Sequence, residues 1–167
     1  MNEEYLFHQT PKELAKDLIN NVPLIEGDTV LEPFKGEGAF YDSLPDWVSK
    51  DWAEIQQGRD YKSIQGKFDW VITNPPFKLE NEDKARVNAF WKILKFYLDK
   101  VNKGIALLGN DHCLNSLTPK RLSEIEASGF SIQKIVVVNV KKWRGRYFFI
   151  VIEKKPANLY SHILKSY

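Results

Sequence analysis

Residues 68–77 read FDWVITNPPF, an apolar run followed by an asparagine, two prolines and a phenylalanine. The run is typical of a buried β-strand, and the prolines end it because each lacks an N–H and has a fixed φ angle. The Asn74 amide oxygen and a neighbouring carbonyl can together accept both hydrogens of one amino group, while Phe77 offers a face for a planar ring. Taken alone, the motif is also an ordinary loop start. As a site, it predicts a pocket for a flat group with an exocyclic amine, such as a nucleobase.

Strand and helix patterns alternate on both sides of this stretch. Short apolar runs predict strands within residues 29–31, 48–55, 104–108, 132–140 and 147–153. Apolar side chains at helical spacing predict helices over residues 10–22, 85–101 and 118–128, with a further helix opening at residues 39–44. Thr10, followed by Pro11 and Glu13, is typical of a helix start with the threonine as N-cap.

This alternation predicts an α/β fold with a mostly parallel, doubly wound sheet covered by helices on both faces. The last two strands are joined by a short connection, so we expect them to pair antiparallel at one edge. Ligands of such sheets bind outside the carboxyl ends of the strands. Residues 32–38, Glu54 and residues 74–77 all follow expected strands, and we therefore expect a single site at that edge.

The composition suits one domain with a substantial core, since 43% of the 167 residues are hydrophobic. No long apolar run or N-terminal signal pattern is present, which predicts a soluble, cytoplasmic protein without membrane contact. The single cysteine excludes a disulfide framework and a cysteine-cluster zinc site, and the histidines lack ligand spacing. We expect no bound metal. The formal net charge of +2 does not identify a partner.

A second motif, LEPFKGEGAF, occupies residues 31–40. It places Glu32 at a strand end, directly before a glycine-containing loop. Gly36 and Gly38 permit a tight turn and a close approach of the backbone to a ligand. An isolated Gly-x-Gly sequence is also compatible with an ordinary turn. Here Glu54 and Asp60 follow in order, ahead of residues 74–77.

In this order, the motifs resemble those of the S-adenosylmethionine-dependent amino-methyltransferases, and most closely the adenine-specific DNA methyltransferases with an NPPF motif. The resemblance covers nearly the whole chain. Residues 7–11 resemble the motif before the first strand, and residues 31–40 resemble the glycine loop. Residues 51–55 and 58–61 resemble the second and third acidic motifs. The resemblance implies a Rossmann-like class I methyltransferase fold with S-adenosyl-L-methionine as cofactor.

The resemblance also implies roles for individual residues. The implied cofactor-binding residues are Thr10, Glu32, Pro33, Gly36, Gly38, Glu54, Ile55 and Asp60. Thr10 would bind the methionine carboxylate, and the Glu32 loop would hold the methionine amino end. Glu54 would accept hydrogen bonds from the ribose, while Ile55 and Asp60 would contact the cofactor's adenine. As plain surface acids, Glu54 and Asp60 would need no ligand.

The implied catalytic residues are Asn74, Pro75, Pro76 and Phe77. The Asn74 oxygen and the Pro75 carbonyl would accept hydrogen bonds from the two N–H groups of an adenine amine and free its lone pair for attack. Phe77 would stack on the target base. A base within a duplex would first have to leave its stack.

Two features depart from the pattern of this family. Its loops usually begin with Asp and carry small residues where this chain has Glu32, Lys35 and Glu37. We also expect one catalytic domain over residues 1–167, with a short tail at residues 157–167 and no separate target-recognition domain. Specificity would then be relaxed, supplied by a protein partner or a second copy, or directed at structured or single-stranded nucleic acid.

Residues 141–146 read KKWRGR and combine cations for phosphates with an aromatic ring for stacking. The expected nucleic-acid contacts are Lys141, Lys142, Trp143, Arg144 and Arg146. The same segment is also typical of a solvated hairpin.

The function expected from these motifs is methyl transfer to the 6-amino group of adenine in DNA. The same chemistry on RNA and a non-catalytic, methyltransferase-like scaffold subunit are the alternatives. Cytosine-modifying relatives tend to have Ser at position 74, and protein glutamine methylation is associated with Tyr at position 77. Asn74 and Phe77 disfavour both of these substrates.

Overall fold

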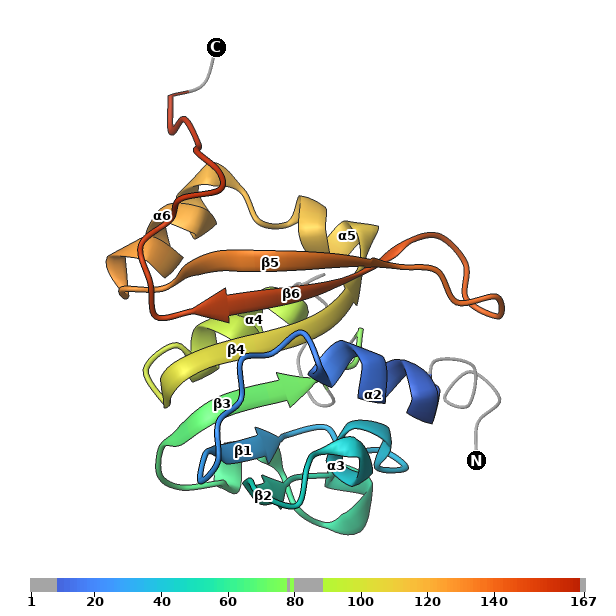
Figure 1. Ribbon diagram of the computed structural model, residues 1–167. Coiled ribbons are helices and arrows are strands. Elements are labelled where there is room, and N and C mark those ends of the chain that lie inside the picture. Colours follow the sequence, from blue (N-terminus) through green and yellow to red (C-terminus); the bar gives the residue numbers. More distant parts are fainter. Residues whose placement is uncertain (1–8, 78, 80–88, 166–167) are drawn as a thin grey trace.

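The computed structural model describes residues 9–77, 79 and 89–165. Its centre is a six-stranded sheet with the order β2-β1-β3-β4-β6-β5 (Figure 1). The strands are β1 (Thr29–Glu32), β2 (Ser49–Trp52), β3 (Phe68–Thr73), β4 (Val101–Asn110), β5 (Ser131–Val138) and β6 (Tyr147–Glu153). The helices are α2 (Lys12–Ile19), α3 (Ala39–Ser43), α4 (Ala89–Tyr97), α5 (Asp111–Asn115) and α6 (Pro119–Ala127). Two short 3₁₀ turns, η1 (Ile55–Gln57) and η2 (Tyr61–Ser63), follow β2.

The direction of the strands confirms the predicted α/β, mostly parallel sheet. β1 pairs in parallel with β2 and β3, and β3 pairs in parallel with β4. β6 runs antiparallel to both β4 and β5. The predicted antiparallel pair is therefore present, but the reversed strand is the inner strand β6 and the edge strand is β5. The short connection after β5 reverses the chain, and β6 then lies between β5 and β4.

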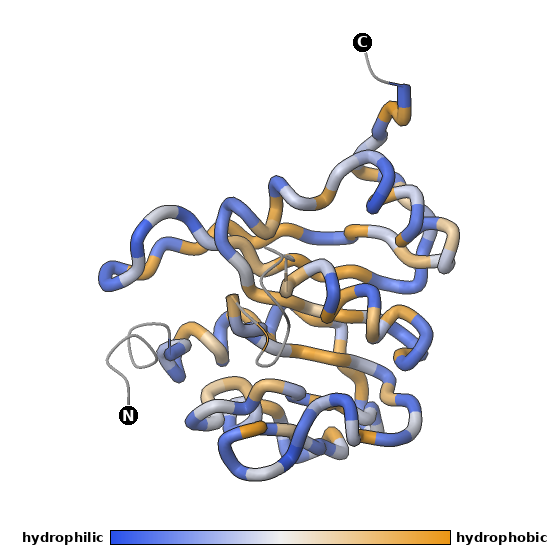
Figure 2. The backbone as a smooth tube through the Cα atoms, turned by 180° about the vertical axis from the view of Figure 1, so that it is seen from behind, coloured by the Kyte–Doolittle hydropathy of each residue, from blue (hydrophilic) through white to orange (hydrophobic). Residues whose placement is uncertain are grey.

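Two apolar layers cover the two faces of the sheet. Side chains alternate along β3, so that Trp70 and Ile72 pack in the layer of α2 and α3 while Val71 packs in the layer of α4 and α6. The tube in Figure 2 shows the hydrophobic segments concentrated in the strands at the centre. This alternation explains why β3 reads as a continuous apolar run in the sequence.

Close approach of β3 and β6 to the backbone of β4 requires a glycine at position 104. A Cβ atom on Gly104 would lie 2.4 Å from the Ile152 carbonyl oxygen and 2.4 Å from the Trp70 ring. Only a residue without a side chain leaves room for the large indole under the sheet.

The structure corrects some predicted element boundaries. Val101 was predicted to end a helix, but it begins β4, where it is buried and paired in register with Phe68. The first residues of the helix predicted over 85–101 lie outside the described residues, and the described part is α4. α5 was not predicted; the Asn110 side chain caps it by accepting from the Cys113 N–H at 3.1 Å. No helix in the described ranges is long and apolar enough to cross a membrane.

Candidate active site

A cavity of about 580 Å³ opens at the carboxyl ends of β1, β2 and β3. Its volume falls within the range of about 300–1,000 Å³ that is usual for small-molecule sites. The predicted residues that line it are Thr10, Glu32, Pro33, Gly36, Glu54, Ile55, Asp60, Asn74, Pro75, Pro76 and Phe77. Gly38 lies beside this set as the residue before α3, with a φ of 90°. Tertiary structure thus brings segments that are far apart in the sequence to one edge of the sheet.

The glycine loop is tied to the end of β2 by its backbone. The Ala53 N–H donates to the Glu32 carbonyl at 2.9 Å, and the Lys35 N–H donates to the Ala53 carbonyl at 3.0 Å. The loop then turns at Gly36, whose φ of 53° is left-handed. The Gly36 N–H donates to Glu54 Oε2 at 2.7 Å. The β1–β2 pairing therefore continues into the loop and sets its position over the cavity.

Glu32 is buried at the base of the cavity, with 2% of its surface exposed. Its carboxyl group accepts hydrogen bonds from the Thr73 hydroxyl and from the Phe34 N–H, and no ion pair reaches it within the described residues. Burial raises the pKa of Glu32 well above its usual value, and the nearby Glu54 adds to this effect, whereas the two hydrogen bonds oppose it. A cationic ligand group would supply the missing counter-charge.

The other two acids of the cavity hold backbone N–H groups. Glu54 accepts from Gly36 and, at 3.1 Å, from the Gln56 N–H, and Asp60 accepts from the Lys62 N–H at 2.9 Å. Each carboxylate has further lone pairs with which it can accept from a ligand. Ile55, 44% exposed, provides an apolar surface in the same cavity.

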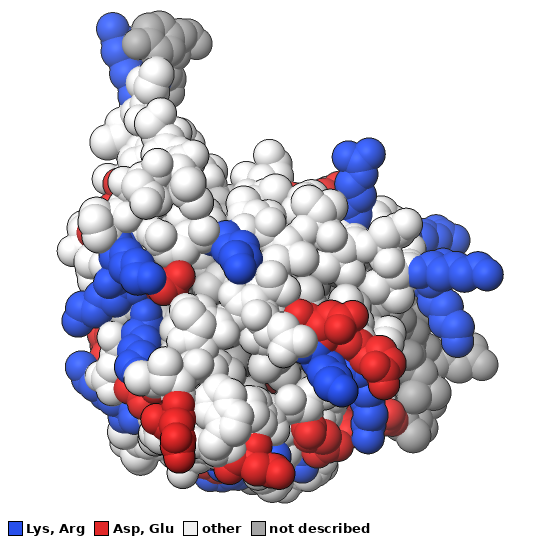
Figure 3. All heavy atoms as spheres, viewed as in Figure 1, with Lys and Arg blue, Asp and Glu red and all other residues white. Residues whose placement is uncertain are grey.

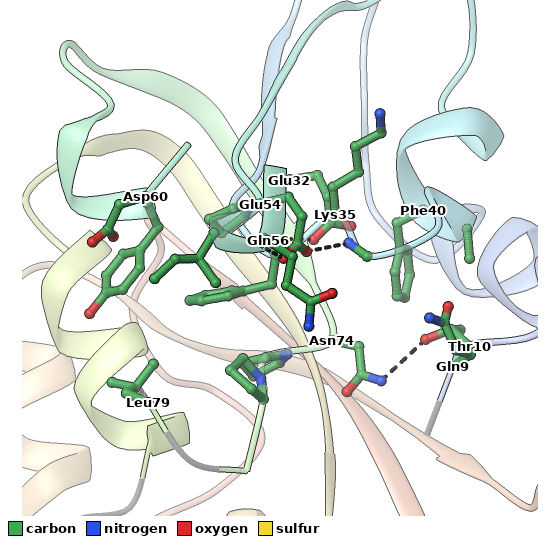
Figure 4. A pocket seen from close by; sticks show the side chains of 18 of the residues that line it. Gln9, Thr10, Glu32, Lys35, Phe40, Glu54, Gln56, Asp60, Asn74 and Leu79 are labelled. Carbon is green, nitrogen blue, oxygen red and sulfur yellow. Dashed lines mark hydrogen bonds between the residues drawn. The ribbon is translucent and has the colours of Figure 1, made fainter. Parts of the chain in front are cut away.

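Asn74 is oriented by Thr10, which lies two residues before α2. Its Nδ2 donates to the Thr10 hydroxyl at 3.2 Å, and Figure 4 shows the amide oxygen pointing away from Thr10. Thr10 was predicted to cap α2, but no side-chain cap is present there; its hydroxyl accepts from Asn74 instead. Pro75 is buried beside Asn74, whereas Phe77 is 45% exposed at the rim.

Sequence reasoning gave no individual binding role to several residues that line the cavity: Gln9, Phe34, Lys35, Ala39, Phe40, Gln56, Tyr61, Lys62 and Leu79. The rings of Phe34 and Tyr61 lie 5.0 Å apart and form an aromatic wall. Phe34 lies within the motif at residues 31–40 and Tyr61 within the motif at residues 58–61, so membership of a motif was the available signal.

The basic segment lies at the same edge of the sheet but does not line the cavity. It forms the connection between β5 and β6, where Lys141, Lys142, Arg144 and Arg146 are exposed. Figure 3 shows Lys and Arg side chains gathered where this connection protrudes. Trp143 differs from the expectation, because its indole is only 7% exposed and its ring lies 4.5 Å from that of Tyr147. It packs in the core, and its burial argues against the stacking role expected for it.

Comparisons with known proteins agree with this architecture. TrmN from Thermus thermophilus matches with a TM-score of 0.61 and 19% identity, over 90% of this chain and 51% of that chain. A methyltransferase from Pyrococcus furiosus matches with a TM-score of 0.63 and 16% identity, over 87% of this chain and 84% of that one. A protein described as a modification subunit of a type I restriction enzyme from Vibrio vulnificus YJ016 matches with a TM-score of 0.60 and 15% identity, over 89% of this chain and 45% of that chain.

The chain thus spans about half the length of TrmN and less than half of the Vibrio protein. No protein-family model matches the chain, and no curated protein matches its sequence. At these low identities the likeness concerns the fold. The chain has the Rossmann-like fold of the class I S-adenosylmethionine-dependent methyltransferases.

Proposed function

We propose that this protein transfers the methyl group of S-adenosylmethionine to the 6-amino group of adenine in DNA. The observation that carries the proposal is the meeting of residues 74–77 with Glu32, Glu54 and Asp60 in one cavity. The fold supports the reaction class, because the solved structures that resemble this chain include methyltransferases. The finer choice of adenine rests on the acceptors at residues 74 and 75 and on the aromatic ring of Phe77.

The polar and apolar groups that line the cavity fit this cofactor. Glu32, which has no counter-charge among the described residues, would hold the cofactor's ammonium group, and Glu54 would accept from the ribose hydroxyls. The apolar surface of Ile55 and the carboxylate of Asp60 would hold the adenine ring and its amine. The hydroxyl of Thr10 accepts from Asn74 and keeps its own hydrogen to donate to the methionine carboxylate. When bound, the cofactor supplies a methyl group activated by a positively charged sulfur.

The catalytic loop holds its acceptors in fixed directions. Thr10 holds the NH2 side of the Asn74 amide, so the amide oxygen is directed to the other side. We infer that this oxygen and the Pro75 carbonyl accept hydrogen bonds from the two N–H groups of the target amine. These bonds draw the amine nitrogen toward tetrahedral geometry. Positive charge would develop on that nitrogen as it takes the methyl group from the sulfur, which would keep the electron pair of the broken bond. Oriented acceptors would stabilise this charge, and the nitrogen would release one proton after the transfer. Two consecutive prolines stiffen the loop, so little reorganisation is needed.

The cations of the β5–β6 connection would bind the nucleic-acid backbone. Lys141, Lys142, Arg144 and Arg146 are exposed at the edge that carries the cavity. Because Trp143 is buried, we assign these contacts to phosphates rather than to stacked bases. Such contacts are independent of sequence, and they leave recognition of the target base to the cavity.

The proposal is tested by incubating the protein with labelled S-adenosylmethionine and separate pools of duplex DNA, single-stranded DNA and RNA. Digested nucleosides are then identified by mass. Wild type should yield methylated deoxyadenosine, and Asn74→Ala should not. Asn102→Ala, the same substitution at the opposite edge of the sheet, should behave as wild type.

Each other outcome redirects the proposal. Methylated adenosine from the RNA pool alone would make RNA the substrate. No product in any pool, together with no cofactor binding by calorimetry, would refute an enzyme and favour a scaffold subunit.

A further inference from the structure

Lys35, in the glycine loop, extends away from Thr10 and Asn74 (Figure 4). Its Nζ lies 4.4 Å from the centre of the Trp52 ring and 5.1 Å from that of the Tyr41 ring. Both distances are within the range of about 6 Å for an attractive cation–π contact. The resemblance described above predicts a small residue at this position, so the contact is a particular feature of this chain.

These contacts belong to a larger cluster. Arg59 lies over the Trp52 ring at 5.2 Å, and Lys50 lies over the Tyr41 ring at 4.8 Å. We call Lys35, Tyr41, Lys50, Trp52 and Arg59 the cation–aromatic cluster. Arg59 is itself held by two hydrogen bonds to the carboxylate of Asp51, at 2.7 and 3.1 Å. The rings come from α3 and β2, so the cluster connects the glycine loop to regular elements of the fold.

The loop is thus held from two sides. On the cavity side the Gly36 N–H donates to Glu54, and on the outer side the Lys35 ammonium contacts two rings. A loop that is already ordered binds a ligand without paying for its own ordering. Lys35 also carries the positive charge of this loop away from Glu32, which keeps the buried acid open to a cationic ligand.

We propose that Lys35 is a positioning residue for the cofactor: it clamps the glycine loop against Trp52 and Tyr41 in the binding geometry before the cofactor arrives. This inference rests on the proposed function for the identity of the ligand. The clamp itself is a property of the ligand-free protein and can be tested separately.

The first experiment measures the Kd of S-adenosylmethionine by calorimetry. Lys35→Met keeps the aliphatic stem and removes the charge, and it should raise Kd by about 3- to 10-fold. Lys35→Arg should bind within about twofold of wild type, because a guanidinium also lies well over indole rings. The matched control is Lys95→Met on α4, which removes a cation 6.0 Å from the centre of the Trp91 ring, outside both the cluster and the cavity, and should leave Kd unchanged.

A double-substitution cycle links the effect to the ring. Trp52→Leu should weaken binding about as much as Lys35→Met, and the double variant should be no weaker than either single variant. Additive losses, or recovery of binding when Lys35→Met is added to Trp52→Leu, would overturn the clamp. The melting temperature of Lys35→Met should stay within about 2 °C of wild type, in keeping with the small effect of a surface substitution. A drop in melting temperature without a change in Kd would also overturn it.

The second experiment needs no ligand. Amide hydrogen exchange at Gly36 should be faster in Lys35→Met than in wild type or Lys95→Met, because the loop opens more often. Equal exchange in all three proteins would refute the clamp. If wild type binds no cofactor but exchange at Gly36 responds as expected, the clamp stands and the proposed function fails.

Discussion

The two edges of the sheet each carry an equally buried acid. The acid at one edge forms an ion pair, and the acid at the other edge forms none within the described residues. At the amino edge, Asp28 is 2% exposed, forms an ion pair with Lys103 and accepts from the Ile25 N–H at 3.0 Å. At the carboxyl edge, Glu32 is also 2% exposed, but among the described residues only the Thr73 hydroxyl and the Phe34 N–H donate to it. Burial is the same at the two sites, and the difference lies in the partners.

The direction of pKa shifts at the two edges follows the partners. Partial burial would by itself raise the pKa of Asp69, near the amino edge. Hydrogen bonds from Thr29 and Asn102, together with the charge of Lys103, outweigh it and lower the pKa. At Glu32, burial outweighs the two hydrogen bonds and the pKa is raised. Asp69 therefore stays ionised, whereas Glu32 resists ionisation.

This contrast separates stability from function. A buried polar group with all its partners contributes to a defined fold, and one that lacks a partner costs stability and is found mainly where a ligand completes it. We therefore expect the amino edge to hold the sheet together, and we propose that the carboxyl edge binds a ligand. The following substitutions test this division, from the largest expected effect to the smallest.

Asn74→Ala should lower the methylation rate by about 100-fold or more, since it removes an acceptor aimed at charge that develops in the transition state. The free energy of unfolding should change by less than about 1 kcal/mol, because the Asn74 side chain is only partly buried. Initial rates and urea unfolding of the same preparation measure the two quantities. A large loss of stability would place Asn74 with the structural groups of the amino edge and break the comparison.

Lys103→Met should destabilise the fold by about 2–3 kcal/mol, because it leaves Asp28 buried without its counter-charge. The value is below that for a fully buried pair, since 37% of the Lys103 side chain is exposed. Denaturant unfolding gives the change, and cofactor affinity should be unaffected. The control is Lys12→Met, whose ion pair with Asp42 is exposed and should contribute about 0–1 kcal/mol. Equal losses of unfolding free energy in both variants would contradict a stabilising role that is particular to the buried pair of the amino edge.

Glu32→Gln should stabilise the protein while weakening cofactor binding. The unfolded chain releases the Glu32 proton near the ordinary pKa of about 4.3, and the folded chain holds it to higher pH. The stability of wild type therefore falls as pH rises from the ordinary value toward the raised one, and glutamine removes this loss. At neutral pH the variant should gain about 1 kcal/mol, or roughly 2–4 °C in melting temperature.

The gain from Glu32→Gln should disappear below about pH 4, where both states of wild type keep the proton. Melting curves of wild type and variant across the pH range measure the difference. Glu13→Gln, at an exposed position in the first turn of α2, is the control and should show no such trend. A gain that is constant with pH would show that ionisation of Glu32 is not its source.

Lys141→Glu combined with Lys142→Glu should weaken nucleic-acid binding by about 3- to 5-fold at physiological salt. The slope of log Kd against log salt concentration should fall by about 2, one for each lost phosphate contact. Fluorescence anisotropy with a labelled oligonucleotide measures both. Lys67→Glu with Lys154→Glu changes the net charge equally but at the amino edge. If it weakens binding as much, the effect comes from overall charge and not from the β5–β6 connection.

Local sequence signals predicted well the strands β3 and β6 and the position of residues 74–77 at the end of β3. The bounds predicted for β3 and β6 agree with the structure, because apolar runs and flanking turn residues act within a few positions. Residues 74–77 were predicted to end β3 at the carboxyl edge, and they line the cavity there. Parallel strands bring their carboxyl ends together, so the order of the motifs was sufficient to predict one shared edge.

Contacts between distant residues had no such signal. Trp143 was predicted to face solvent as part of a basic segment, but the ring of Tyr147 and the core beside it bury the indole. Thr10 was predicted as a helix cap, and it binds Asn74 instead, 64 positions away in the sequence. Val101 is apolar and suits a helix or a strand equally well, and only the presence of β3 beside it selects the strand.

The sequence by itself determined the fold class, the order of the strands along the chain and the residues available to a site, because these follow from local periodicity, from prolines and glycines, and from motif order. Tertiary structure alone decided which acids received partners. Asp28 meets Lys103, whereas Glu32 meets no cation among the residues that the structure describes. Lys35 meets Trp52, and Trp143 enters the core. Each of these outcomes depends on the distance between side chains from separate elements, and that distance exists only once the sheet has assembled.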